Sequence, residues 1–364
     1  MKDFTYFIIV LIIILTFSLL NSMNRSENFE TNENSDLKKV ERPFVNIYDQ
    51  NGTMLNVALL SRPFYAPNHY TDYEKIKEKY LILGISSYQE FPNQPRNPKD
   101  NYNNDNIYDS VTWTNMCEGW LHCFKDKDKY IPKTMKSTLL SESDFIDCNI
   151  HVPNKDVKKK YDFIYICHRD DLNDCSTKEW VAYNKNLDLA NKCFEIMCKK
   201  YHLKGLLIGR SGCSLPKGCE KYLETTPKLG YYDLVKKYDE AKFIFIPNVH
   251  DASPRVLTEA LCHDVSCLVN NNIVGGWKYV SDESGMLFDD INNFEEKLKI
   301  HIKNLNNYKP RNFYIENYGI LNAGKKLRDF CVDIFGDRLN IDADKLDYIT
   351  PEFPKESYKR CELA

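Results

Sequence analysis

Short apolar runs alternate with amphipathic segments through the second half of the chain. A short apolar run predicts a buried strand, and apolar residues that recur every three or four positions predict a helix. Strands are expected at 161–167, 205–209, 243–247, 265–269 and 285–288, and helices at 186–201, 231–241, 323–335 and from Pro254 onward. Strands and helices that alternate at this spacing predict an α/β domain with a parallel sheet and right-handed crossovers.

The first half of the chain has a less regular pattern. Residues 80–85, YLILGI, predict a buried strand, and 117–124 and 138–140 are shorter apolar segments. The charged run Lys158-Lys159-Lys160 marks the expected boundary between two domains. We expect a membrane anchor at 1–22 and a polar stalk at 23–42. A first α/β domain at 43–157 and a second at 158–336 should follow, and then a polar tail at 337–364.

An uncharged apolar run occupies residues 4–20. It is at the short end for a membrane span, which needs about 20 apolar residues. Lys2 precedes the run and acidic residues follow it, so the positive-inside rule predicts a single-pass anchor with the rest of the chain extracytoplasmic. The alternative is a cleaved signal peptide, but residues 21–23, NSM, make a poor cleavage site. A cytosol-facing orientation stays open as well.

Charge and cysteine content narrow the class of protein. The 364 residues carry a formal net charge of −3, which gives no sign of a nucleic-acid binder. Thirteen cysteines are scattered without a Cys-x-x-Cys pair, so a zinc site of ordinary ligand spacing is not expected. Cys213 and Cys219 share a loop, where a local disulfide is an option.

The stretch 251–288 carries the candidate chemistry. Ser253 suits a helix N-cap, and Pro254 suits the first helical position. The expected buried side of this helix is formed by four apolar residues, Val256, Leu257, Ala260 and Leu261. Glu259 lies about 130° from that side on the helical wheel. We therefore expect Glu259 to face solvent or a ligand.

Asp251 is expected just outside the N-terminus of the same helix. Free backbone N–H groups and the helix dipole favour an anion there. A nucleotide diphosphate would fit such a site, with the carboxylates of Asp251 and Glu259 on either side. The alternative is that Arg255 and Glu259 form an exposed ion pair and Asp251 only helps to cap the helix.

The stretch resembles the donor-binding segment of the retaining glycosyltransferases of family 4, which have the glycosyltransferase B (GT-B) fold. That family has two acids eight residues apart, followed by an apolar strand, a Gly-Gly turn and a Gly-hydrophobic-Phe ending. The matching positions here are Asp251, Ser253-Pro254, Glu259-Ala260, Val265 to Val269, Gly275-Gly276 and Gly285 to Phe288. The first acid departs from the family, because Asp is one methylene shorter than Glu. The resemblance covers roughly residues 161–335.

The resemblance implies two Rossmann-like domains facing a cleft, the first of them abbreviated, with helix 323–335 returning to the first domain. It assigns Asp251 to the donor-sugar hydroxyls and Glu259 to the ribose. Arg169 and Lys178, after the first strand of the second domain, are candidates for the diphosphate clamp, and which of them fills each role stays open. The implied donor-binding set also includes Gly209, Tyr231, Ser253, Pro254 and Arg255. His122 is a weak candidate on the acceptor side.

The expected function is retaining transfer of a sugar from a nucleotide-sugar donor, without a metal or cofactor, to a glycan, lipid or protein acceptor. A nicotinamide oxidoreductase would need a G-x-G-x-x-G turn. The run at 209–212, GRSG, lacks that pattern. A phosphorylase of the same fold would use a lysine-bound cofactor, for which the sequence gives no signal. Epimerases of this fold have a different pattern of acidic residues. The remaining alternative is a non-catalytic, membrane-tethered glycan- or nucleotide-binding protein on a degenerate transferase fold.

Overall fold

The computed structural model describes residues 37–64, 66, 68–93, 112–351, 361 and 363. The expected anchor at 4–20 and most of the expected stalk lie outside the described residues. Within the described part of the chain, no helix has the length and apolar character that crossing a bilayer requires. Residues from Lys39 onward form one compact unit, which contains two lobes, each built on its own sheet.

The N-terminal lobe contains a six-stranded sheet in the order β12-β1-β2-β3-β4-β5. Strands β2 to β5 are parallel, whereas β1 pairs antiparallel with β2 and with β12. The strands are β1 (Phe44–Asp49), β2 (Met54–Leu60), β3 (Leu81–Ile85), β4 (Gly119–His122), β5 (Ser137–Leu139) and β12 (Ile349–Thr350). Strand β3 is the one expected at 80–85, and its residues are apolar on both faces because both faces of this part of the sheet are covered.

Helices cover the N-terminal sheet from both ends of the sequence. Helix α2 (Asn68–Ile76) comes from the first half of the chain, and α9 (Gly319–Phe335) comes from near the C-terminus. Ile320, Leu327 and Cys331 of α9 are buried against apolar residues of β2 and β3. The last helix therefore does return to the first domain.

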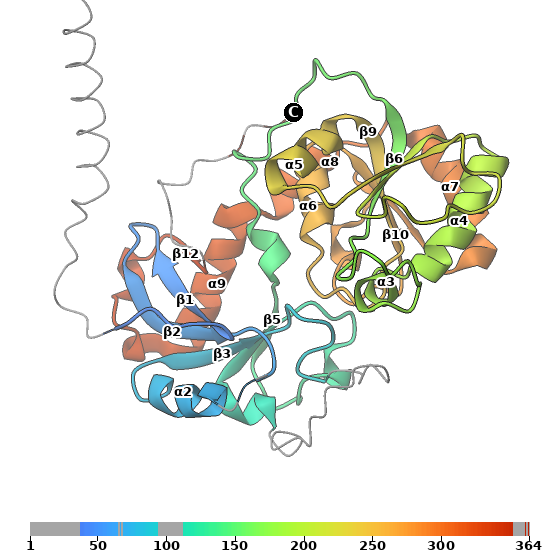
Figure 1. Cartoon of the computed structure of the whole chain (residues 1–364). Helices are drawn as coiled ribbons and strands as arrows, with labels where there is room; N and C mark the ends of the chain where they lie inside the picture. Colours follow the sequence, from blue (N-terminus) through green and yellow to red (C-terminus); the bar gives the residue numbers. More distant parts are fainter. Residues whose placement is uncertain are drawn as a thin grey trace, which may run out of the picture. The chain divides into compact units, whose positions relative to one another are not determined.

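The C-terminal lobe contains a fully parallel sheet in the order β11-β10-β9-β6-β7-β8. Its strands are β6 (Tyr161–Ile166), β7 (Gly205–Ile208), β8 (Leu223–Thr226), β9 (Ala241–Ile246), β10 (Ser266–Asn270) and β11 (Gly285–Phe288). Its helices are α3 (Trp180–Asn184), α4 (Leu187–Lys199), α5 (Tyr231–Asp239), α6 (Arg255–Cys262), α7 (Ile291–Asn304) and α8 (Pro310–Asn317). Helices α4 and α7 pack on one face, and α5, α6 and α8 on the other (Figure 1).

This strand order contains a topological switch point. The chain runs from β6 to β7 and β8 in one direction, and β9 then pairs with the opposite edge of β6. Connections on the two sides of β6 and β9 diverge, and ligands of such folds bind at the carboxyl ends of the strands where this occurs. The loops that follow β6 and β9 therefore border the expected site.

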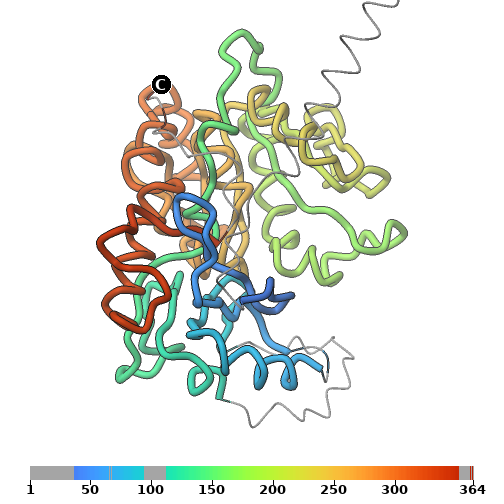
Figure 2. Tube along the Cα trace, turned by 90° about the vertical axis from the view of Figure 1, so that its left-hand side faces the viewer, coloured from blue at the N-terminus to red at the C-terminus, as the bar shows by residue number. Residues whose placement is uncertain are grey.

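The region 337–364 differs from the polar tail that was expected. Leu346, Tyr348 and Ile349 are buried against the N-terminal lobe, and β12 extends the sheet beside β1. In Figure 2 the red end of the chain runs beside the blue N-terminal strands. The first lobe is therefore assembled from both ends of the described chain, which shifts the expected domain boundary at 336.

A buried ion pair connects the two lobes. Asp144 belongs to a short 3₁₀ helix, η3 (Glu142–Phe145), and its carboxylate accepts from Lys278 Nζ at 2.6 Å and from the Tyr279 hydroxyl at 2.6 Å. The side chains of Asp144 and Lys278 are each 3% exposed. Breaking a pair this deeply buried would leave an uncompensated charge.

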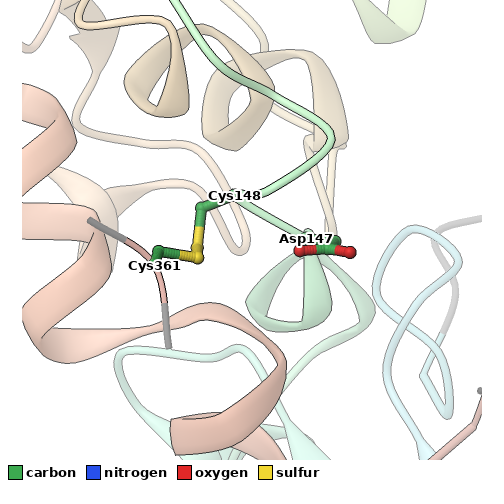
Figure 3. Close-up of side chains that lie close together, drawn as sticks. All are labelled: Asp147, Cys148 and Cys361. Carbon is green, nitrogen blue, oxygen red and sulfur yellow. A yellow bond between two sulfur atoms is a disulfide. The ribbon is translucent and has the colours of Figure 1, made fainter. Parts of the chain in front are cut away.

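The described residues contain two disulfides, and neither is the local Cys213–Cys219 bond that the sequence left as an option. Cys175 bonds Cys213, and Cys148 bonds Cys361, while Cys219 is a buried free thiol. Cys213 meets Cys175 because the loops after β6 and β7 lie side by side, which the sequence does not reveal. Asp147 lies beside the second disulfide (Figure 3). The group Asp147, Cys148 and Cys361 offers no thiolate to a metal while this disulfide is formed.

Candidate functional site

Asp251 lies in the loop that follows β9, at the switch point. Its Oδ2 accepts from Lys185 Nζ at 2.5 Å and from Asn248 Nδ2 at 2.8 Å. The Asp251 side chain is 14% exposed and that of Lys185 is 24% exposed. The carboxylate is thus fixed in position and paired with a cation that remains partly open to solvent.

A glycine holds the Asp251 loop against the next connection. Gly275 N donates to Asp251 O at 3.0 Å, and a Cβ at position 275 would lie 1.7 Å from Ala252 O. No side chain fits between these two backbones. The Gly-Gly turn at 275–276 therefore serves close packing beside the candidate site.

Helix α6 starts one residue later than expected. Pro254 is the N-cap and Arg255 the first helical residue, and no side chain caps the helix. The Ser253 hydroxyl instead contacts the other lobe, accepting from Ser143 N at 2.8 Å and lying 2.8 Å from Ser143 Oγ. Ser253 therefore links the start of α6 to η3 rather than capping the helix.

Glu259 is buried, contrary to the expectation that it faces solvent. It is 7% exposed, and its Oε2 accepts from the Tyr238 hydroxyl at 2.8 Å. Burial raises the pKa of Glu259, although the hydrogen bond from Tyr238 and the charge of Arg255 oppose the shift. Because α5 packs against α6, the wheel position that looked exposed is covered by Tyr238. The alternative of an exposed Arg255–Glu259 ion pair is therefore wrong, because Glu259 is buried and accepts a hydrogen bond from Tyr238.

Arg255 makes its ion pair with the N-terminal lobe. Its Nη2 lies 2.7 Å from Glu142 Oε2, and Glu142 Oε1 lies 3.6 Å from Arg42 Nη1. Arg255 and Ser253 therefore contact adjacent residues of η3. The start of α6 is tied to the other lobe at positions 253 and 255.

The two candidates for the diphosphate clamp do not converge on Asp251. The Arg169 guanidinium donates to the carbonyls of Leu172 and Ser211, the latter at 2.6 Å. Lys178 is exposed in the loop between β6 and α3. The cation that reaches Asp251 is Lys185, directly before α4.

Taken together, the loops after β6 and β9 present a fixed carboxylate, a cation and the N-terminus of an eight-residue helix. A second carboxylate, Glu259, lies one to two turns along that helix. Such a set can bind hydroxyl groups and stabilise an anion.

Solved structures share this architecture at low sequence identity. The chain resembles TarM with a TM-score of 0.52 and 14% identity, over 72% of this chain and 52% of TarM. It resembles a glycosyltransferase from Rickettsia africae ESF-5 with a TM-score of 0.51 and 13% identity, over 77% of both chains. It resembles the lipopolysaccharide outer core galactosyltransferase WaaB with a TM-score of 0.50 and 11% identity, over 71% of this chain and 70% of that one.

The fold is of the GT-B type. No protein-family model and no curated protein matches the sequence. The chain spans about half the length of TarM. These similarities support the GT-B-type fold alone. Membership of family 4 and retaining chemistry are still expectations from the sequence.

Three remaining predicted residues have local roles within the GT-B-type fold. Gly209, at φ +93°, ends β7, and a Cβ there would lie 2.4 Å from the His168 Cα. The Tyr231 hydroxyl lies 2.8 Å from His151 Nε2 at the start of α5. His122 is buried, and burial with nearby lysines lowers its pKa to about 4, so it is neutral at pH 7.

Lys185, Glu90, His250 and Arg210 are functional candidates that sequence reasoning missed. Lys185 precedes Asn186, whose φ of +52° lets the chain turn into α4. A Lys-Asn pair directly before an amphipathic helix was the available signal. Arg210 is 3% exposed, and neither of its terminal nitrogens has a partner among the described residues. Glu90 and His250 contact each other across the two lobes, and no sequence signal joins residues so far apart.

Proposed function

We propose that this protein is a glycosyltransferase that moves a sugar from a nucleotide-sugar donor to an acceptor with retention of configuration. The observation that carries the proposal is Asp251, held by Lys185 at the switch point of a GT-B-type fold, at the start of α6. The resemblance of residues 251–288 to family 4 supports retention. The acceptor class, whether glycan, lipid or protein, stays open.

The chemistry requires stabilisation of a leaving diphosphate. As the bond between the anomeric carbon and the phosphate oxygen breaks, negative charge collects on the diphosphate. Lys185 Nζ and the backbone N–H groups at the start of α6 would offset that charge. In this proposal these groups suffice and no divalent metal is required.

The two carboxylates have different roles in the proposal. Asp251 would accept hydrogen bonds from hydroxyls of the donor sugar, because it lies in the loop between β9 and α6. Glu259 would accept from the ribose of the nucleotide while Tyr238 holds its other side. Lys185 replaces Lys178 as the proposed lysine of the diphosphate clamp, since Lys185 is the one that contacts Asp251.

One observation favours a second candidate, a binding protein without turnover. The Arg169 guanidinium is engaged by backbone carbonyls, so this proposed clamp residue would have to exchange partners to meet a diphosphate. The shorter acid at position 251 points the same way. A tethered protein that binds a nucleotide sugar or glycan would retain the site but not the reaction.

The test is release of nucleoside diphosphate by the full-length chain from a panel of nucleotide sugars. We expect slow hydrolysis of one donor. Glu259→Gln should raise the donor KM about 10- to 100-fold, because a charged acceptor is replaced by a neutral one. Asp251→Asn should lower turnover about 100-fold. Glu295→Gln, which removes an exposed carboxylate paired with Lys200, is the matched control and should leave both unchanged.

The outcomes separate the two candidate functions. Turnover that Asp251→Asn leaves intact would remove Asp251 from the reaction. No turnover, combined with a rise in melting temperature in one nucleotide sugar, would favour the binding protein. Neither turnover nor stabilisation would mean that the chain has the fold without this function.

We also propose that the protein is extracytoplasmic, and the two disulfides support this location. Cys148–Cys361 and Cys175–Cys213 join segments that are 213 and 38 residues apart. Disulfides of this kind persist in oxidising compartments and are rare where glutathione keeps thiols reduced. Labelling of unpaired thiols in protein isolated from cells under acid quench would test this, since cytosolic protein should be labelled at all four cysteines.

A further inference from the structure

A carboxylate of the N-terminal lobe meets a histidine of the Asp251 loop. Glu90 Oε1 lies 2.7 Å from His250 Nδ1, and 160 residues separate the two. The side chain of Glu90 is 10% exposed and that of His250 is 20% exposed. His250 directly precedes Asp251, so this contact borders the proposed donor site from the side of the other lobe.

The segment that carries Glu90 is held rigidly. It follows β3, and its neighbour Phe91 is fully buried between the rings of Trp113 and Trp120. Ser86 Oγ donates to Phe91 O at 2.6 Å and accepts from Trp120 Nε1 at 2.9 Å. The Glu90 carboxylate is therefore aimed by the core of its lobe.

The backbone next to Glu90 is strained. Gln89 has a φ of +46°, in the left-handed region that a residue with a side chain disfavours. Such conformations persist where surrounding contacts impose them, and they concentrate at functional sites. The Gln89 amide reaches across to Asn184 Oδ1 at 3.3 Å, so the same turn makes two contacts with the C-terminal lobe.

The hydrogen bond fixes which ring nitrogen of His250 is free. A carboxylate only accepts, so Nδ1 carries the hydrogen that Glu90 receives, and the neutral ring keeps its lone pair on Nε2. The ring of Tyr183 stacks on His250 with centroids 5.0 Å apart and planes 16° apart, which fixes the ring plane. His250 makes no further hydrogen bond within the described chain.

A second atom of the pair is also available. Glu90 Oε2 is buried and has no hydrogen-bond partner among the described residues. A buried carboxylate oxygen without a partner is costly unless a ligand or water donates to it. The pair therefore offers two unused acceptors, His250 Nε2 and Glu90 Oε2, where the two lobes meet beside Asp251.

We propose that His250 is the catalytic base that receives the proton of the acceptor hydroxyl, and that Glu90 is the positioning residue that orients it. The inference rests on the proposed transferase function. The acceptor oxygen forms its bond to the anomeric carbon on the same face of the sugar from which the diphosphate leaves, so the configuration is kept, and the diphosphate leaves with the electrons of the broken bond. The acceptor proton passes to His250 Nε2. Glu90 stabilises the resulting imidazolium, because the hydrogen bond between them then joins a cation and an anion and becomes stronger.

The arrangement also specifies the kind of acceptor. Glu90 Oε2 would accept from a second hydroxyl of the acceptor while His250 takes the reacting one. An acceptor with two neighbouring hydroxyls, as on a sugar or a polyol, satisfies both atoms. A serine or threonine side chain offers only one. The pair therefore favours a glycan or polyol acceptor.

The test compares variants with the donor that wild-type protein turns over, in water and with mono- and dihydroxyl acceptors. His250→Ala should lower kcat by 10²- to 10⁴-fold with little change in the donor KM. Imidazole added to His250→Ala should restore part of the turnover, because a free base can then occupy the vacated space. Glu90→Gln should lower kcat at least 10-fold and abolish the preference for a dihydroxyl acceptor. His202→Asn, which changes a histidine whose ring contacts Tyr222, is the matched control.

The failures can be told apart. An inactive wild type that releases no nucleoside diphosphate from any donor overturns the transferase proposal, and this inference with it. An active wild type whose His250→Ala variant keeps its kcat overturns this inference alone. A His250→Ala variant with lost activity, an unchanged melting temperature and no response to imidazole would also refute the assignment of His250 as base.

Discussion

Glu259 combines a buried position with a charge that the proposed reaction needs. Within the described part of the chain, its side-chain hydrogen bond comes from Tyr238, whose own pKa is raised well above the ordinary range by burial. Because burial disfavours the charged carboxylate, an ionised Glu259, as the proposed reaction requires, would lower the stability of the folded chain. Sites that bind ligands often carry such a trade-off between stability and function.

This trade-off gives a pH-dependent prediction for Glu259→Gln. Burial raises the pKa of Glu259, so the folded chain binds this proton more tightly than the unfolded chain does. Stability from this group is therefore greatest at low pH and falls as pH rises from the unfolded value of roughly 4.3 through the folded value. Glutamine keeps an acceptor for Tyr238 without the charge. Urea unfolding should show a larger gain for Glu259→Gln at about pH 8 than at about pH 4.5.

The wild-type chain and the Glu259→Gln variant differ at this one carboxyl group. The pH dependence of the difference between their free energies of unfolding therefore reports on Glu259. An equal difference at the two pH values would show that burial imposes no penalty on the carboxylate. Glu259→Ala is less informative, because it leaves the buried Tyr238 hydroxyl without its acceptor and adds about 1–3 kcal/mol of unrelated destabilisation.

Residue identity in the site was only partly predictable. Asp251 and Glu259 were proposed from their spacing around a helix start, because that spacing is local. The partners Lys185 and Tyr238 come from other elements, so their contacts depend on how the sheet is ordered. The burial of Glu259 was missed for the same reason, as a helical wheel does not show which neighbouring helix covers a face.

At the scale of elements, the loop after β9 is positioned by the turn before η4 (Trp277–Tyr279). Val274 N donates to Val249 O at 2.9 Å and Gly275 N to Asp251 O at 3.0 Å. Two consecutive backbone bonds thus hold the residues on either side of His250. No side chain caps α6, so these backbone bonds position the loop before it.

Gly275→Ala should therefore damage the site through the backbone. A Cβ would overlap Ala252 O at 1.7 Å, which no side-chain movement relieves, so the loop must shift. We expect a loss of at least about 2 kcal/mol in the free energy of unfolding, as for other backbone clashes, together with weaker donor binding. Thermal unfolding and donor titration measure both.

Gly230→Ala is the matched control for unfolding, since a Cβ at position 230 meets nothing within 4 Å. It should change the midpoint little. Similar midpoints for the two variants would show that the β9 loop tolerates displacement and is not fixed by its neighbour.

Element prediction succeeded where apolar runs are long and failed at short edges. Strands β6, β7, β9, β10 and β11 lie within one or two residues of their expected positions. The edge strand β8 has the sequence LETT, with one apolar residue, and β12 contains two residues. Such strands form because a neighbouring strand offers hydrogen bonds, and a single sequence does not display that neighbour.

At the scale of the whole molecule, two of the described connections pass between the lobes. The first passage follows η3 and the second is at Tyr318 and Gly319, between α8 and α9. The Cys148–Cys361 disulfide lies beside both, and Gly319 and Cys148 both line a cavity of about 460 Å³ there. The covalent link thus secures the C-terminal segment at the junction of the lobes.

The two disulfides should differ in their contribution to stability. In the loop-closure description, the cross-link that spans 213 residues restricts the unfolded chain more than the one that spans 38. Replacing Cys148 and Cys361 by Ser should therefore cost about 1.5 kcal/mol more than replacing Cys175 and Cys213. Urea unfolding of the two double variants tests the order, and a larger loss for the shorter loop would contradict it.

The return of the chain to its first lobe also affects how the protein is made. Gln50 and Asp347 are hydrogen-bonded although 297 residues separate them. At roughly 5–20 residues per second, a ribosome needs about 15–60 s to synthesise that interval. Throughout this time β1 has an unpaired edge and the surface that α9 later covers is open. The nascent first lobe therefore remains incomplete until α9 and β12 have been synthesised, and a chaperone that shields an exposed strand edge would act in that period.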